Sequence, residues 1–359
     1  MKTRVGLFFS GNTSKLDESF DLAFRLMSDL SSEKIELVPV YLSKDNRFYY
    51  DASFNKKDTF DNIDEFLLKL NPVSIVAENQ RFSLMVNHNK YFSKKVETID
   101  VGFNCVRTTD NFQVALQGYF ELIGLPYTGC KVEGTVLGLD RVWCLQLLKE
   151  NKVDIIDFIW DYSENIINEI SEFTNRVKKL GLPCVMESVS DTITKKPIRI
   201  VHVKDIQPAL EKVLGYSSKV VVEKEFSKCQ EFSCAYLGNR NYEKTSAIAK
   251  YAEEKEMDTK TIDYSIDLDN IEMERRRWNV VDVSKRLTEE LKYLTVKICR
   301  LLKLQGVVRI TFYVSNDEKS IYVKEIDIFP SSLVLMMFEK QGISLNEIVK
   351  VLLQNAIVQ

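Results

Sequence analysis

Two carboxylates separated by one residue, Glu325 and Asp327, are the most informative chemical feature of this sequence. Side chains two apart on a β-strand point to the same face. The run 307–314 also alternates, and the polar turn after it predicts a β-hairpin. A symmetric hairpin sets Thr311 opposite Glu325 and Arg309 opposite Asp327. We therefore expect two carboxylates, a hydroxyl and a guanidinium on one face.

This arrangement has two readings. Carboxylates with open positions are what Mg²⁺ takes, usually alongside substrate phosphates. The alternative is an ordinary cross-strand pair of Arg309 and Asp327, which contributes less than about 1 kcal/mol and needs no function. The spacing alone favours the ordinary pair.

Size and composition exclude several classes of protein. At 359 residues the chain has room for more than one domain, and 45% hydrophobic with 28% charged residues is typical of a globular protein. The net charge of −3 leaves no basic surplus for nucleic acid. No apolar run has transmembrane length, and the start leads directly into a strand-like run. We expect a cytoplasmic protein with no membrane partner.

The cysteines and histidines narrow the chemistry further. The seven cysteines are scattered without a Cys-x-x-Cys pair, so we expect reduced thiols. His88 and His202 are the two histidines of the chain, which leaves almost no material for a histidine-based metal site or a Ser-His-Asp triad.

The elements that must position these residues follow from hydrophobic periodicity. A strand at 5–9, a helix from about 16 and a strand at 35–42 predict an α/β layer. Further along, the pattern predicts helices at 114–123, 136–150, 166–180, 287–302 and 345–356, and strands at 183–189, 197–202 and 220–222.

Four blocks of sequence, taken in order, identify a family. They are 116–129, which contains Gln117-Gly118 and Leu125-Pro126-Tyr127-Thr128-Gly129; 220–224, followed by Glu231 and Leu237-Gly238-Asn239; Gln305-Gly306-Val307-Val308-Arg309; and Glu325-Ile326-Asp327-Ile328-Phe329-Pro330. Their order and spacing resemble the D-alanine–D-alanine ligases of the ATP-grasp superfamily.

The resemblance implies a fold and an activity. The expected fold is an α/β and α+β ATP-grasp fold of three domains, at 1–129, 130–222 and 223–359, with ATP between the last two and a homodimer as the assembly. In the family, ATP phosphorylates the carboxylate of one D-alanine and the amine of a second attacks the acylphosphate. The protein supplies positive charge, two Mg²⁺ ions and positioning. The implied ligands are a nucleotide and a small amino acid.

The adenosine end of the family site is retained. Glu223 and Lys224 fall where the family contacts the adenine edge, and Glu231 falls where an acidic residue holds the ribose hydroxyls. Arg309 matches the arginine near the reacting phosphate, and Arg141 replaces the phosphate-binding lysine of a Met-Asp-Lys motif. The alternative for the carboxylates and Lys224 is solvated charge at a strand end.

The phosphate end departs from the family. Glu187 stands where a lysine contacts the nucleotide phosphates. Reversing a charge about 5 Å from phosphate is a swing of about 6 kcal/mol at an effective dielectric near 20, or about 10⁴ in affinity. The segment 192–197 has no glycine where the family has a Gly-Ser-Ser-x-Gly loop over the phosphates, and Lys195 and Lys196 are the candidate replacement charges.

The metal and substrate ends are also altered. Thr311 takes the place of the family's aspartate, Glu325 is kept, and Asp327 replaces an asparagine, so we expect one Mg²⁺ rather than two. At the substrate end, only Gln117-Gly118 survives of a long glycine-rich motif spanning 107–118. The first-loop carboxylate has two candidates, Asp17 and Glu18. The further losses at this end are a lysine and a tyrosine in 262–268 and the glycine replaced by Ser331.

Three hypotheses remain. The first is a degenerate homologue without standard ligase activity that binds a ligand or regulates a partner, with a retained nucleotide site. Its basis is the simultaneous loss of family residues at the phosphate, substrate and second-metal positions, because function depends on the site rather than on the fold. The second is an active ATP-dependent carboxylate–amine ligase with altered substrate specificity. The third is a site completed by a partner chain that lends Lys195 or Arg276, from the cluster 275–277.

Overall fold

The computed structural model describes residues 2–11, 18–30, 32–89, 92–106, 112–189, 197–215, 218–227, 229–239, 241–252, 278–329 and 332–357. Several predicted features lie outside these ranges: Asp17, Lys195, Lys196, Ser331, the arginine cluster 275–277 and the segments 107–111 and 262–268.

The N-terminal domain is built on a seven-stranded sheet of order β6-β5-β4-β3-β2-β1-β7. Strand β1 is parallel to β2 and β7, and the remaining pairs are antiparallel. The predicted strands 5–9 and 35–42 are confirmed. The elements are β1 (Thr3–Phe9), α1 (Glu18–Asp29), β2 (Ile35–Leu42), β3 (Phe48–Tyr50), the 3₁₀ turns η1 (Ala52–Asn55) and η2 (Lys57–Phe60), α2 (Ile63–Leu67), β4 (Val73–Glu78), β5 (Arg81–Asn89), β6 (Phe92–Ile99), β7 (Val101–Asn104) and α3 (Phe112–Ile123).

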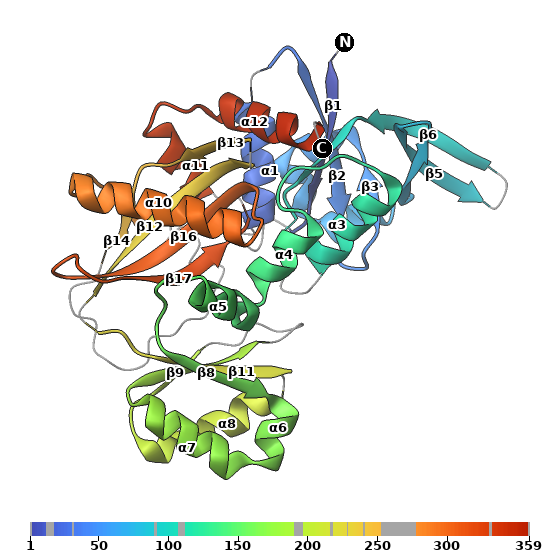
Figure 1. The fold of residues 1–359 in the computed structure, drawn as a ribbon. Coiled ribbons are helices and arrows are strands. Elements are labelled where there is room, and N and C mark those ends of the chain that lie inside the picture. The colour runs from blue at the N-terminus through green and yellow to red at the C-terminus, as the bar shows by residue number, and fades with distance from the viewer. Residues whose placement is uncertain are drawn as a thin grey trace.

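The central domain is a four-stranded sheet of order β10-β9-β11-β8, whose outer face is covered by helices (Figure 1). The elements are β8 (Phe158–Tyr162), α6 (Ser163–Asn168), α7 (Ile170–Leu180), β9 (Cys184–Val189), β10 (Ile198–Ile200), η3 (Val203–Asp205), α8 (Ile206–Leu214) and β11 (Lys219–Lys224). The predicted boundary after 222 falls inside β11. The backbone N–H of Lys224 donates to the carbonyl of Asp157 at 2.9 Å, so the chain enters and leaves this domain at one place.

The C-terminal domain has a sheet of order β15-β14-β12-β16-β17, with β13 paired to β12. Its elements are β12 (Cys229–Asn239), β13 (Tyr242–Thr245), β14 (Ala249–Tyr251), β15 (Trp278–Val280), α10 (Lys285–Leu301), β16 (Gly306–Ser315), β17 (Ile321–Asp327), α11 (Ser332–Glu339) and α12 (Leu345–Ile357). The predicted hairpin is the β16–β17 pair, so its existence is confirmed.

Two predicted helices are broken in the structure. The run 136–150 was expected as one helix but forms α4 (Val132–Leu139) and α5 (Arg141–Glu150). Asp140 has an extended backbone, and its carboxylate accepts from the N–H of Trp143 at 3.0 Å, which is the geometry of a helix N-cap. The run 166–180 is also interrupted, at the non-helical backbone of Glu169, but the Glu169 side chain makes no capping hydrogen bond. The first break places Arg141 in the first turn of α5.

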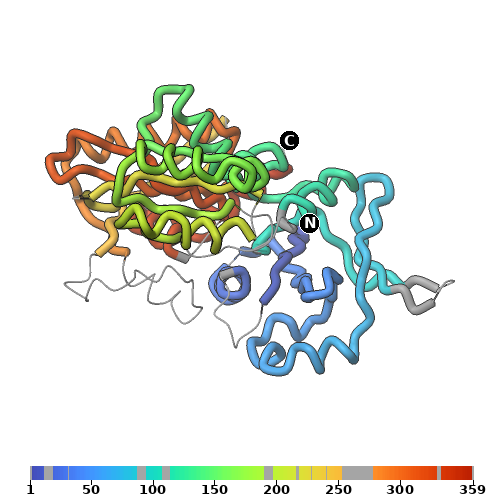
Figure 2. The backbone as a smooth tube through the Cα atoms, turned by 90° about the horizontal axis from the view of Figure 1, so that it is seen from below, coloured from blue at the N-terminus to red at the C-terminus, as the bar shows by residue number. Residues whose placement is uncertain are grey.

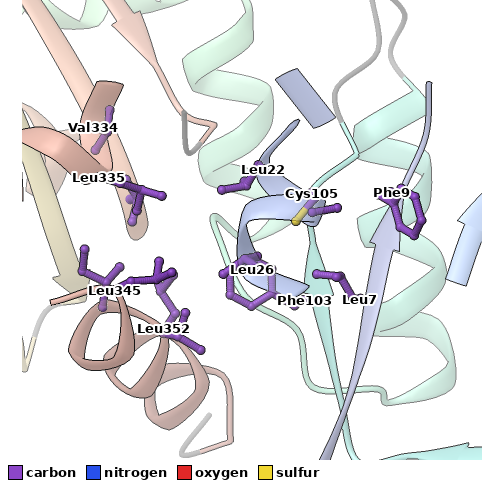
Figure 3. Packing of buried hydrophobic residues seen from close by; sticks show 14 of the residues in the cluster. Leu7, Phe9, Leu22, Leu26, Phe103, Cys105, Val334, Leu335, Leu345 and Leu352 are labelled. Carbon is purple, nitrogen blue, oxygen red and sulfur yellow. The ribbon is translucent and has the colours of Figure 1, made fainter. Parts of the chain in front are cut away.

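The N-terminal and C-terminal domains share one hydrophobic core. Leu7 of β1 and Leu26 of α1 belong to the same cluster as Leu335 of α11 and Leu352 of α12, which face them across the domain boundary (Figure 3). The central domain has a separate core between its sheet and α6–α8. It lies against the C-terminal domain, with the N-terminal domain to the side (Figures 1 and 2).

The two larger domains also approach closely through glycine. Gly306 has a φ of +85°, and a Cβ there would lie 2.7 Å from the Cα of Gly129, so neither the backbone conformation nor the space admits a larger residue. In the described part of the chain, no helix is long and apolar enough to cross a membrane.

The shared core predicts that one substitution weakens both larger domains. Leu352 is 4% exposed, so Leu352→Ala should lower the free energy of unfolding by about 2–5 kcal/mol, measured by urea denaturation. Leu122→Ala, at a leucine of α3 that is 84% exposed, is the control and should change it by less than about 0.5 kcal/mol. Hydrogen exchange should accelerate in β1 as well as β16. Acceleration confined to the C-terminal domain would contradict a shared core.

Candidate functional site

The β16–β17 hairpin has the register that the alternation predicted. Thr311 lies opposite Glu325 and Arg309 lies opposite Asp327. Nη2 of Arg309 is 3.4 Å from Oδ2 of Asp327, and their side chains are 12% and 5% exposed. The ordinary cross-strand pair is therefore present. One feature was not expected: the pairing shifts after Thr311, so that Lys324 forms a bulge.

The hydroxyl of Thr311 is engaged inside the sheet. Its Oγ1 lies 2.8 Å from Oγ of Ser233 on β12, and both residues are buried. Asp327 accepts from the backbone N–H of Phe329 at 3.1 Å, while Glu325 is exposed. Within the described ranges, no three Asp, Glu, His or Cys side chains are grouped as a metal would need. Of the predicted trio, Thr311 is bonded to Ser233 and Asp327 is paired with Arg309, which leaves Glu325 as the exposed carboxylate.

Arg141 is held by partners from two domains. Its Nε and Nη2 donate to the two carboxylate oxygens of Glu223 at 2.5 and 2.7 Å, and its Nη1 donates to the carbonyl of Lys324 at 2.9 Å. Burial opposes the charge of the guanidinium, but the attraction of Glu223 outweighs it and raises the pKa of Arg141. The residue predicted to bind phosphate is thus engaged by protein acceptors.

Glu187 faces the same side of the central sheet as Glu223. Val221 pairs with Glu187 across β11 and β9, and Glu223 is two residues further along β11. The carboxylate of Glu187 lies 3.9 Å from Nε of Arg141. Burial raises the pKa of Glu187, Arg141 lowers it, and the neighbouring carboxylates Glu223 and Glu325 raise it again, with a net upward shift.

Of the two remaining predicted residues, Glu231 is linked to this group through Lys324 and Lys224 is not. Lys224 follows Glu223 in β11 and therefore points to the opposite face of the sheet. Glu231 of β12 accepts from Nζ of Lys324 at 2.7 Å. The structure thus brings Arg141, Glu187 and Glu223 together, but not Lys224.

Sequence reasoning missed two cations at this site. Lys324 reaches Glu231 because the bulge turns its side chain, which no local pattern predicts. Lys219 of β11 forms an ion pair with Asp140 and lies 4.8 Å from the ring of Trp143. The signal for Asp140 was its residue type, since aspartate is favoured at a helix N-cap, but the periodicity placed it inside one helix.

The balance of charge decides what the site can do. Without Lys224, which points to the opposite face of the central sheet, the predicted residues and Lys324 comprise three cations against five carboxylates, for a formal charge of −2. Each of these cations forms an ion pair with a carboxylate: Arg141 with Glu223, Arg309 with Asp327, and Lys324 with Glu231. The arrangement is self-neutralising and presents a polyphosphate with carboxylates as well as cations.

Comparisons with known proteins agree on one family. Residues 147–354 match the model described as the D-ala D-ala ligase C-terminus. The D-alanine–D-alanine ligase of Thermosipho melanesiensis is 26% identical over 350 residues, covering 96% of this chain and 91% of that relative.

Solved structures give the same result for the fold. The VanG D-Ala:D-Ser ligase from Enterococcus faecalis superposes with a TM-score of 0.79 at 16% identity, over 99% of this chain and all of that one. The Bacillus anthracis D-alanine–D-alanine ligase complexed with ATP superposes with a TM-score of 0.68 at 18% identity, over 100% of this chain and 98% of that one.

The raised pKa of Glu187 predicts a pH-dependent stability difference. Because the pKa is higher in the folded state, the contribution of Glu187 is favourable below the ordinary glutamate value of about 4.3 and is lost as the pH rises through the folded value. Glu187→Gln should therefore gain stability relative to the natural protein as the pH rises above the ordinary glutamate value. Urea unfolding at a series of pH values above it measures the difference; a constant difference would contradict the assignment.

Proposed function

Because the chain belongs to the D-alanine–D-alanine ligase family of ATP-grasp proteins, we propose that it is a ligase-like protein without the standard ligase reaction, which acts by binding a ligand between its central and C-terminal domains. The observation that carries the proposal is the engagement of Arg141 by Glu223 and the carbonyl of Lys324. The same family resemblance predicts a cytoplasmic homodimer.

The phosphate side supports the loss of the reaction. To contact a phosphate, Arg141 must give up contacts with two carboxylate oxygens and a carbonyl, which are strong because the donor is charged. Glu187, 3.9 Å from its Nε, would then repel the phosphate. A nucleotide binds here only at the cost of both effects.

The residues predicted to bind metal also support the loss of the ligase reaction. In a standard phosphoryl transfer, Mg²⁺ bridges the phosphates and neutralises the developing charge. Thr311 is a neutral, buried hydroxyl bonded to Ser233, so it does not supply a carboxylate. Glu325 and Asp327 are the protein oxygens that remain for one ion, and Asp327 is also paired with Arg309.

A second candidate function is an active carboxylate–amine ligase with altered substrate specificity. The observation in its favour is that Arg309, Glu325 and Asp327 come together at one end of the β16–β17 hairpin, with Arg309 opposite Asp327. The related Bacillus anthracis ligase complexed with ATP supports ATP as its nucleotide.

Titration calorimetry and a turnover assay separate the two functions. We expect ATP, with or without Mg²⁺, to bind the natural protein no more tightly than about millimolar, given a penalty of about 10⁴ from Glu187. With ATP, Mg²⁺ and D-alanine, no phosphate release above the protein-free rate is expected. Release that requires an amino acid and is lost in Glu325→Ala would establish the second function instead.

Reversing the charge of Glu187 should restore nucleotide binding. Glu187→Lys replaces a repelling carboxylate with an ammonium and gives Glu223 a second cation, so Arg141 is freed for phosphate. We expect ATP affinity to rise at least about tenfold, with about 10⁴ as the upper bound. Glu150→Lys, with the same charge change at the exposed far end of α5, is the matched control and should leave affinity unchanged. Equal gains in both variants would mean a nonspecific charge effect.

A further inference from the structure

Helix α5 lies between the central and C-terminal domains and packs on both. Val142 and Leu145 cluster with Val221 of the central sheet. Cys144 and Leu148 belong to the core of the C-terminal domain. Figure 1 shows α5 at the boundary between the central and C-terminal domains. A side chain at the start of this helix can therefore contact both domains.

Arg141 makes such contacts with polar groups on each side. Glu223 lies at the end of β11 in the central sheet, and the carbonyl of Lys324 lies on β17 in the C-terminal hairpin. The planar guanidinium directs its N–H groups outward in a fixed fork, so one side chain can bond both partners without a change of rotamer. The two acceptors are held at a fixed separation as a result.

The bulge at Lys324 supplies the acceptor on the hairpin. Its carbonyl accepts from Arg141, while its ammonium pairs with Glu231 on the neighbouring strand. A bulged residue leaves the regular ladder, and its backbone groups are free to bond elsewhere. The same irregularity therefore serves both contacts.

We propose that Arg141 is an interdomain latch that holds the central domain against the C-terminal hairpin without a bound ligand. Its guanidinium joins β11 to β17. The latch is a property of the ligand-free protein, so it does not depend on the proposed function.

The test measures the distance between the two domains in the full chain. Spin labels are placed at Lys212→Cys in α8 and Tyr293→Cys in α10, two exposed positions. The background carries Cys229→Ser, which removes the one described cysteine that is not buried. Pulsed dipolar spectroscopy without ligand should give one narrow distance distribution for the protein with Arg141 intact.

Arg141→Ala should shift that distribution to longer distances by more than its original width. The loss removes the guanidinium that joins Glu223 of the central sheet to the carbonyl of Lys324 on the hairpin, so the two domains are no longer held together at this point. Arg141→Lys keeps the charge but lacks the fork, so it should give an intermediate distribution. This partial rescue distinguishes a latch from a simple loss of packing.

A matched control is available within the central domain. Arg199 and Glu225 form the same kind of two-contact pair, at 2.5 and 3.0 Å, but both lie in the central domain, because the backbone N–H of Glu225 donates to the carbonyl of Pro183 just before β9. Arg199→Ala should leave the distance distribution unchanged. If Arg141→Ala does not fold, Glu223→Gln removes one charge at the same contact and should give the same direction of shift. An unchanged distribution in the folded variants, or an equal shift in Arg199→Ala, would overturn the proposal.

Discussion

The contact of Arg141 with Glu223 and the carbonyl of Lys324 is the interaction on which the arrangement of the site depends. It exists because Asp140 interrupts the helix and caps α5, which places Arg141 in a first turn. A guanidinium that is partly removed from water needs a carboxylate, and Glu223 supplies it. Glu187 therefore lies beside Arg141 while the guanidinium is already hydrogen-bonded to Glu223 and to the carbonyl of Lys324.

Alternation predicted which side chains share a face of each hairpin strand, because side-chain direction has a period of two, but the pairing of Thr311 with Glu325 also depends on the bulge at Lys324. The bulge at Lys324 was not predictable, since an extra residue in one strand has no local signature. The resemblance located Arg141 and Glu223 at the site but not their pairing. The two residues are 82 positions apart, and only the folded sheet brings them together.

The helix break at Asp140 shows a limit of predicting helix boundaries from hydrophobic periodicity. Apolar residues continue through the run 136–150 with helical spacing, so periodicity favours one helix. The competing effect is local: an aspartate that bonds the N–H of Trp143 and pairs with Lys219 gains more from an extended backbone than from a helical one. Lys219 lies in another part of the chain, so its ion pair with Asp140 could not be predicted from the local sequence.

The chain enters and leaves the central domain at neighbouring positions, Asp157 and Lys224, and this has a mechanical consequence. Asp157 and Lys224 are joined by a backbone hydrogen bond, so the strands leading in and out run side by side. A pulling force applied between β1 and α12 would pass through the core that their domains share and bypass the central sheet. The central domain would carry load only after that core had ruptured, as expected for a module inserted into a single continuous body.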